Sequence, residues 1–285
     1  MTAKIIDGRK IGGEIKKQVS LEVDELISRY KIIPNITTIE IGDNPESNLY
    51  LELRDKACKE VGIESNQLDF LPNIPEREVI NAIIKLNKDN NVHGIFIQFP
   101  LPDHISHSKL INILNPKKDV EGLTPYNMGR TLAGDENIIP ITPLSVLTIL
   151  EHENTNLKGK DVVIVNHSNL VGKPLVALFL NRNSTVSVCH VFTKNLSHYS
   201  SNADILVTAT GIPKIITKDH VKKNAFVIDV GIVKTNEGVC GDVDFILVKE
   251  KAGKLTPVPG GVGPVTVACS LLNILKTFKV CVEEK

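Results

Sequence analysis

The sequence has no excess of charge of either sign and no long apolar run. Its 33 basic and 33 acidic side chains cancel, so the formal net charge is zero. A balanced charge gives no reason to expect binding to nucleic acid or to a membrane surface. No apolar run approaches the roughly 20 residues of a membrane-spanning helix, and the first ten residues lack the apolar core of a signal sequence. We therefore expect a soluble, cytoplasmic protein.

Paired cysteines are also lacking. The five cysteines are scattered, without a CxxC pair, which fits reduced thiols better than a disulfide framework or a zinc site. His104 and His107 have no carboxylate or cysteine partner at metal-ligand spacing, so we expect no metal site. The sequence contains no GxSxG nucleophile elbow and no Walker loop.

The most unusual segment that is present is Pro-Val-Pro-Gly-Gly-Val-Gly-Pro at 257–264, followed by Thr266. Three prolines and three glycines in eight residues predict a rigid loop and exclude a helix or a central strand. Bare backbone in such a loop lets a flat ligand approach closely. The alternative is a structural turn before the last helix. Unusual segments at 44–58, 94–102 and 115–122 favour a ligand site.

Hydrophobic periodicity predicts an α/β fold with two lobes. We expect helices at 9–30, 46–61, 76–88, 143–152 and 265–279, and a turn at Asn44-Pro45. We expect strands at 35–42, 94–98, 161–165, 185–190, 204–208 and 225–229. The first lobe is an α/β substrate lobe, 1–138 and 266–285, to which the C-terminal helix returns. The second, 139–265, is a Rossmann-like nucleotide-binding lobe, and helix 143–152 is expected to bridge the two.

Four segments carry a resemblance to a known family: 94–102, 115–122, 168–174 and 257–264. In this order and spacing they resemble the methylenetetrahydrofolate dehydrogenase/cyclohydrolase family, over about Ile6 to Lys276. The resemblance implies a folate cleft between the lobes, a nicotinamide cofactor on the second lobe and a homodimer packed through the nucleotide-binding lobes. It implies two reactions of one-carbon metabolism. A hydride passes from 5,10-methylenetetrahydrofolate to NADP, and water then opens the methenyl product to 10-formyltetrahydrofolate.

One departure from the family lies on the helix that follows Asn44. The family pattern Tyr-x-x-x-Lys-x-Lys has become Tyr50, Arg54 and Lys56. Tyr50 and Arg54 are one turn apart and share a face of the helix. In the family the first lysine is thought to move protons during ring opening, which needs a pKa near neutrality, whereas a guanidinium stays protonated. Hydrolysis is therefore in doubt, while hydride transfer is performed by the cofactor. Alternatively, Arg54 is only a surface residue.

A second departure is Glu121, where the family has aspartate in Lys-Asp-Val-Asp-Gly. In the family this carboxylate pairs with the amino and ring nitrogens of the pterin, and Glu121 is one methylene longer. We hypothesise an ion pair between Arg54 and Glu121. The resemblance makes Arg54, Gln98, Tyr50 and Glu121 the catalytic candidates. The same resemblance gives the substrate-binding candidates, Tyr50, Pro100, Leu101, Glu121, Pro259, Gly263 and Thr266.

The third set of departures concerns the cofactor. Where the family has Gly-Arg-Ser and His-Ser, this chain has Asn166-His167-Ser168 and His190-Val191. An arginine that commonly contacts the 2′-phosphate of NADP is missing, and no acidic residue replaces it to accept the ribose hydroxyl of NAD. His167, His190 and Lys194 can supply positive charge, or the histidines are only polar loop residues. NADP, NAD and weakened or lost binding all stay open. The cofactor-binding candidates are Asn166, His167, Ser168, Val171, Gly172, His190, Val191, Thr210, Gly211, Gly231 and Ile232.

Three functions are therefore compatible with the sequence. The first is a dehydrogenase with impaired cyclohydrolase activity. The second is a bifunctional enzyme that tolerates the substitutions. The third is a catalytically impaired folate-binding relative that has lost one or both activities.

Overall fold

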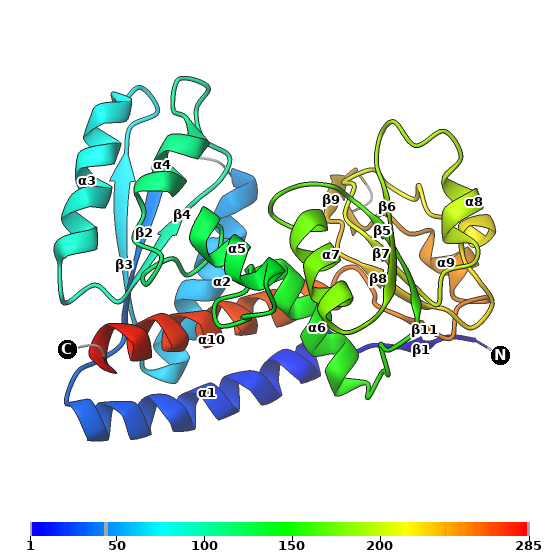
Figure 1. The fold of residues 1–285 in the computed structure, drawn as a ribbon, viewed down its shortest axis with the longest axis horizontal. Helices are drawn as coiled ribbons and strands as arrows, with labels where there is room; N and C mark the ends of the chain where they lie inside the picture. Colours follow the sequence, from blue (N-terminus) through cyan, green and yellow to red (C-terminus); the bar gives the residue numbers. More distant parts are fainter. Residues whose placement is uncertain (1, 43–44, 237, 284–285) are drawn as a thin grey trace. The chain divides into compact units, whose positions relative to one another are not determined.

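A computed structural model describes residues 2–42, 45–236 and 238–283 of the chain (Figure 1). The chain divides into two compact units. Unit 1 comprises Met1–Gly12, Thr131–Asp135 and Thr142–Thr266. Unit 2 comprises Gly13–Arg130, Glu136–Ile141 and Val267–Lys285. Asn44, where the sequence predicts a turn, lies outside the described residues.

Unit 2 is built on a three-stranded parallel sheet in the order β3-β2-β4. Every residue of the central strand β2 is buried. The three strands are β2 (Asn35–Ile41), β3 (Glu64–Phe70) and β4 (Gly94–Ile97). The helices that begin or continue in this unit are α1 (Gly8–Tyr30), α2 (Pro45–Val61), α3 (Glu76–Lys88), α4 (His107–Ile113), α5 (Pro125–Leu132) and α10 (Val262–Glu283).

The two faces of this sheet pack against different helices. Successive side chains of a strand point to opposite faces. Ile39 of β2 and Ile95 of β4 pack in one core with Val79 of α3 and Leu110 of α4. The intervening residues of both strands face the other side, which α2 covers. This second face carries the side chains that form the candidate site.

Unit 1 is built on a six-stranded parallel sheet in the order β1-β11-β8-β7-β5-β6. Its strands are β1 (Lys4–Ile5), β5 (Asp161–Val165), β6 (Thr185–Cys189), β7 (Ile205–Thr208), β8 (Phe226–Asp229) and β11 (Lys254–Leu255). The other elements are α6 (Ile141–His152), α7 (Gly172–Asn181), α8 (Leu196–Ser200), the 3₁₀ helix η1 (Lys218–His220), α9 (Phe245–Val248) and the hairpin of β9 (Val233–Thr235) with β10 (Gly238–Cys240).

The order of this sheet places a switch point at β5. The chain leaves β5 to form β6 on one side and β7 on the other. In open parallel sheets, ligands bind outside the carboxyl ends of the strands at such a point. The segment between β5 and α7 lies there, which confirms the predicted Rossmann-like nucleotide lobe.

Most predicted elements are confirmed, including the helix at 76–88 and the strand at 161–165, both with the predicted bounds. The C-terminal helix belongs to unit 2 from Val267 onward, as predicted. Helix α6, which was expected to bridge the lobes, lies in unit 1 from Thr142 onward.

The prediction that 257–264 excludes a helix was wrong for its last three residues. Helix α10 begins at Val262, so Pro264 lies in its first turn. Proline is tolerated there because its missing N–H would have no partner inside the helix. The loop before it packs against α1: the Gly8 amide donates to the Gly260 carbonyl at 2.9 Å, and a Cβ on Gly8 would lie 1.7 Å from the Gly261 carbonyl oxygen.

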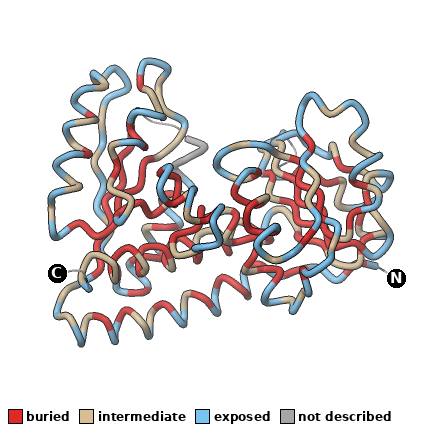
Figure 2. Tube along the Cα trace, viewed as in Figure 1, coloured by how far each residue is buried: buried red, intermediate tan, exposed pale blue. Residues whose placement is uncertain are grey.

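The prediction about apolar runs also needs correction. By length and composition, α10 is apolar enough to cross a membrane, with a mean hydropathy of 1.6 over 18 residues. Core helices of soluble proteins pass the same test, and 56% of this window is buried inside the structure. Figure 2 shows buried positions along this helix and along the strands.

Candidate functional site

Phe96 of β4 is the centre of a polar and aromatic cluster in unit 2. The ring of Tyr50 lies 6.1 Å from the Phe96 ring, and the Arg54 guanidinium carbon lies 4.4 Å from its centroid. Both residues come from one face of α2, as their spacing predicts. Arg54 is fully buried, with 0% exposure, so its interpretation as a surface residue was wrong.

The Arg54 guanidinium is held through one nitrogen. Its Nη2 donates to Thr38 Oγ1 on β2 and, at 3.2 Å, to the Asp55 carboxylate, which also accepts from Ser65 Oγ at 2.7 Å. Its Nε and Nη1 atoms are buried and have no hydrogen-bond partner in the described part of the chain. Arg54 thus forms its ion pair with the neighbouring Asp55. The hypothesised pair with Glu121 is absent from the described residues and was wrong.

Glu121 is half-buried in the segment after α4. Burial raises its pKa well above the usual range, Asp119 adds to this effect, and Arg54 opposes it. The segment itself is fixed by Asp119, whose carboxylate accepts from the amides of Gly122 at 2.9 Å and Thr124 at 2.8 Å. Asn273 of α10 donates to the Val120 carbonyl at 2.8 Å. Glu121 therefore projects from a rigid backbone.

Gln98 follows β4 and lies two residues beyond Phe96, on the same side of the strand. Its Oε1 atom is buried without a partner among the described residues. Burial raises the pKa of Tyr50 to about 12, so this phenol stays protonated. Pro100 is exposed and Leu101 is half-buried, directly after Gln98.

The three other substrate candidates, Pro259, Gly263 and Thr266, belong to unit 1. Pro259 is exposed and Gly263 is half-buried with open space at its Cβ position. Thr266 Oγ1 donates to the Val262 carbonyl at 3.1 Å and lies 3.1 Å from Ser145 Oγ.

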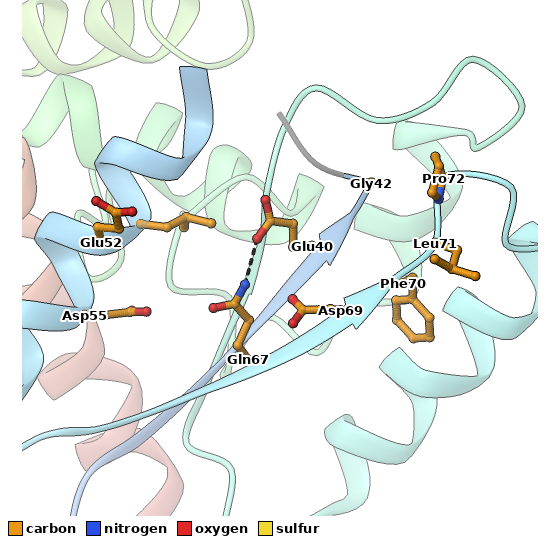
Figure 3. A pocket seen from close by; sticks show the side chains of 10 residues that line it. Glu40, Gly42, Glu52, Asp55, Gln67, Asp69, Phe70, Leu71 and Pro72 are labelled. Atoms are coloured by element: carbon orange, nitrogen blue, oxygen red, sulfur yellow. Dashed lines mark hydrogen bonds between the residues drawn. The ribbon is translucent and has the colours of Figure 1, made fainter. Parts of the chain in front are cut away.

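A separate acidic cavity of about 540 Å³ lies in unit 2 (Figure 3). Helix α2 contributes Glu52 and Asp55, and the strands contribute Glu40 and Asp69. The Glu40 carboxylate accepts from the Gln67 amide at 2.7 Å. None of the predicted substrate residues lines this cavity, although Asp55 connects it to Arg54.

In unit 1 the side chain of Asn166 closes the loop between β5 and α7. Its Oδ1 accepts from the amides of Ser168 at 2.8 Å and Gly172 at 3.0 Å, and its Nδ2 donates to the Ala209 carbonyl at 2.6 Å. Ser168 Oγ accepts from the Val171 amide at 3.1 Å. A Cβ on Gly172 would lie 2.2 Å from the Asn166 carbonyl oxygen, so this position needs glycine.

His167 and His190 are stacked, with ring centroids 4.8 Å apart and an interplanar angle of 30°. The Phe192 amide donates to His190 Nδ1 at 3.2 Å, which leaves the hydrogen of the neutral ring on Nε2. Val191 is 79% exposed. A cavity of about 560 Å³ beside the stack contains no carboxylate in its lining, Ser187, Val188, His190, Phe192, Thr193, Lys194, Asn195, His198 and Tyr199.

The last cofactor candidates, Thr210, Gly211, Gly231 and Ile232, follow β7 and β8. Backbone amides of the first three donate to two buried carboxylates, Asp242 and Asp229. Ile232 is 64% exposed. The role of Asp242 was missed, because only the fold brings it to these segments.

Two family profiles match the chain. Residues 6–121 match the tetrahydrofolate dehydrogenase/cyclohydrolase catalytic domain, and residues 140–282 match the NAD(P)-binding domain of the same family. This chain belongs to the tetrahydrofolate dehydrogenase/cyclohydrolase family. The family and fold predicted from the sequence are confirmed.

Similar proteins cover nearly the whole chain. The bifunctional protein FolD of Methanosarcina barkeri is 49% identical, over 96% of this chain and 95% of that protein. The crystal structure of FolD from Campylobacter jejuni has a TM-score of 0.95 at 40% identity, covering 97% of this chain and 99% of that chain. FolD of Trypanosoma brucei, in complex with NADP and an inhibitor, has a TM-score of 0.94 at 33% identity, covering 98% of each chain.

Proposed function

We propose that this chain oxidises 5,10-methylenetetrahydrofolate to the methenyl form with NADP or NAD, and hydrolyses the methenyl product slowly. Family membership supports the folate substrate and the nucleotide. The observation that supports slow hydrolysis beside normal oxidation is the burial of Arg54. Its guanidinium is tethered to Thr38 and Asp55 and lies over Phe96, at the position where the family resemblance expects a lysine.

This arrangement lacks a proton carrier at position 54. General acid–base catalysis needs a group whose pKa lies near the working pH, and a guanidinium remains charged throughout that range. Tyr50, with a pKa of about 12, also stays protonated. Arg54 supplies a fixed positive charge and Tyr50 a ring surface, which serve binding better than hydration.

Glu121 is the proposed partner of the pterin. Its carboxylate can accept two hydrogen bonds from the amino and ring N–H edge. Because burial raises its pKa, substrate binding through the carboxylate should weaken as the pH falls. Gln98, with an unsatisfied buried Oε1 atom, offers a further acceptor.

The geometry of unit 1 fits a nicotinamide nucleotide, whose role when bound is to accept the hydride. Gly172 begins α7 where no Cβ fits, and helix N-termini bind phosphates. The cavity beside His190 is lined by basic and neutral groups, without a carboxylate for the ribose hydroxyl of NAD. We therefore assign the 2′-phosphate of NADP to His190 Nε2, His167 and Lys194, with NAD as the weaker nucleotide.

The wider assignments follow the same resemblance. We propose a folate lobe of 1–138 and 266–285 and a nucleotide lobe of 139–265. The match of residues 6–121 to the catalytic domain and the assignment of Val267–Lys285 to unit 2 support this division, whereas β1 pairs with β11 in the sheet of unit 1. We also propose a cytoplasmic homodimer. Light scattering on the purified protein should give twice the mass of the chain, and the mass of one chain would contradict the dimer.

The test is a spectrophotometric assay with 5,10-methylenetetrahydrofolate and either NADP or NAD. The methenyl product is followed without acid and again after acid has converted any formyl product back. Methenyl product that accumulates, with little gain after acid, is the expected result. Product visible only after acid would show efficient hydrolysis. No product with either nucleotide, on folded protein that binds folate, would point to the non-catalytic relative.

A further inference from the structure

Two buried aspartates lie behind the segments assigned to the nicotinamide. Asp229 is the last residue of β8 and is 3% exposed, while Asp242 follows β10 and is 0% exposed. Neither forms an ion pair with a basic side chain in the part of the chain that the structure describes. An unpaired buried carboxylate is unfavourable unless hydrogen bonds replace the lost water.

Asp242 binds the end of β7 and the turn that follows it. Its Oδ2 accepts from Thr208 Oγ1 at 2.8 Å and from the Thr210 amide at 2.5 Å, and its Oδ1 accepts from the Gly211 amide at 3.0 Å. One carboxylate therefore holds three residues of the segment 208–211, Thr208, Thr210 and Gly211.

Asp229 binds its own turn and the segment that carries Asp242. Its Oδ1 accepts from the amides of Gly231 at 3.0 Å and Asp242 at 3.1 Å, and its Oδ2 accepts from the Val243 amide at 2.9 Å. Asp229 thus binds the backbone of Asp242 itself. Asp242 holds the segment 208–211, and Asp229 holds Gly231 and the segment 242–243.

Two glycines show that this arrangement has no free space. A Cβ on Gly231 would lie 2.1 Å from Asp242 Oδ1, and a Cβ on Gly241 would lie 2.0 Å from Asp229 Oδ2. Each carboxylate is in van der Waals contact with glycine backbone of the opposite segment. A small displacement of either side chain would move both segments.

We propose that Asp229 and Asp242 are positioning residues for hydride transfer, which hold Thr210-Gly211 and Gly231 in the one arrangement that orients the nicotinamide ring. The proposal rests on the assignment of these segments to the nicotinamide half of the nucleotide. The carboxylates act through the segments whose amides they bind. Displacement of a reacting group by about 1 Å can lower a rate by about a hundredfold.

The test substitution is Asp242→Asn, which keeps the shape of the side chain but turns one acceptor atom into a donor facing backbone N–H or Thr208. Binding of NADPH is compared with binding of adenosine 2′,5′-bisphosphate, which lacks the nicotinamide. Steady-state kcat and KM are measured with methylenetetrahydrofolate and NADP. The matched control is Asp244→Asn, two residues away, because asparagine can keep the α9 cap that Asp244 provides.

For Asp242→Asn we expect kcat to fall about tenfold or more, NADPH binding to weaken, and adenosine bisphosphate binding to stay within about twofold of wild type. Asp244→Asn should resemble wild type in all three. Unchanged kcat and NADPH binding would overturn the proposal. Equal loss of both nucleotides would also overturn it, because the pair would then hold the whole lobe.

Failure of the proposed function gives a different pattern. If wild type binds NADPH and adenosine 2′,5′-bisphosphate but shows no turnover, the proposal is still tested by binding alone. Asp242→Asn should then weaken the binding of NADPH relative to that of the bisphosphate. A wild-type protein that binds neither overturns the proposal together with the proposed cofactor.

If Asp242→Asn does not fold, Thr208→Val serves as the second variant, because it removes a single hydrogen bond to Asp242. It should also lower kcat, by a smaller factor than Asp242→Asn. An unchanged kcat in Thr208→Val would count against the proposal.

Discussion

The candidate sites of the two units differ in whether their buried polar atoms have hydrogen-bond partners within the described residues. In the site of unit 2, the buried Nε and Nη1 atoms of Arg54 and the buried Oε1 atom of Gln98 have no hydrogen-bond partner within the described residues. In unit 1, Asp229 and Asp242 each accept hydrogen bonds on both oxygens. Unsatisfied buried polar atoms are rare in folded proteins and often mark functional sites. This difference supports the proposal that the site of unit 2 presents atoms to a substrate, whereas Asp229 and Asp242 of unit 1 hold backbone segments in place.

The largest effect is expected from Gly231→Ala. Its Cβ would overlap Asp242 Oδ1, so the carboxylate pair and both segments must shift. We expect the free energy of unfolding to fall by about 3 kcal/mol or more, beside a loss of nucleotide binding. Denaturant unfolding measures the first and NADPH titration the second. Gly13→Ala is the control, since nothing lies near its Cβ and α1 should gain about 0.5–1 kcal/mol.

A pH-dependent stability should follow from Asp229. Burial, with Asp242 adding to it, raises the pKa of Asp229 from 3.8 to about 7, so the folded state holds this proton more tightly than the unfolded state. The resulting stabilisation is complete below about pH 4 and is lost as the pH rises through about 7. Wild type should therefore lose stability over this range relative to Asp229→Asn. Denaturant unfolding of both proteins at several pH values measures this difference. If their free energies of unfolding change with pH by the same amount, the prediction is contradicted.

Arg54→Met should have the opposite sign from the glycine substitution. Replacing both partners of a buried ion pair with apolar side chains is often neutral or stabilising by about 1–4 kcal/mol, whereas removing one partner costs about 3–5 kcal/mol when the other charge stays buried. The side chain of Asp55 is 29% exposed, so water can still solvate its charge when Arg54 is replaced. Arg54 leaves two buried N–H groups unsatisfied, and Asp55 keeps its hydrogen bond from Ser65. We expect a Tm equal to or a few degrees above wild type in calorimetry. A Tm well below wild type would show that Arg54 is retained for stability, and would remove the contrast between the units.

The smallest effect is expected from Thr208→Val, which deletes one of the hydrogen bonds to Asp242 at nearly constant volume. The loss should be about 1 kcal/mol of unfolding free energy, because Thr210 and Gly211 still donate to the same carboxylate. Denaturant unfolding of this variant beside wild type measures it. A loss as large as that of Gly231→Ala would mean that the side-chain bond, and not the backbone amides, stabilises the pair.

The fold was predictable where burial follows a simple period. Helix 76–88 was predicted with its observed bounds because Val79 and Ile83 recur on one buried face. Strand β3 was missed because it lies at the edge of its sheet and is rich in polar and charged residues, Glu64–Phe70. The first turn of α10 was missed because proline at the start of a helix looks like proline in a loop.

The site was predictable where neighbours in sequence are neighbours in space. The shared face of Tyr50 and Arg54 follows from one helical turn. The pairing of Arg54 with Asp55 was not predicted, because the hypothesis joined two departures from a family pattern and overlooked the adjacent carboxylate. The contacts of Asp242 with Thr210 and Gly211 depend on the order of strands in a sheet, which no local pattern reveals.

The most direct test of the account is the ratio of cyclohydrolase to dehydrogenase turnover in wild type and Arg54→Lys. Both rates come from the assay read with and without acid, so a general loss of folding or binding cancels in the ratio. We expect lysine to raise this ratio about tenfold or more, because a positioned proton donor contributes about 10²–10⁴ in rate. An unchanged ratio would contradict the claim that Arg54 limits hydrolysis.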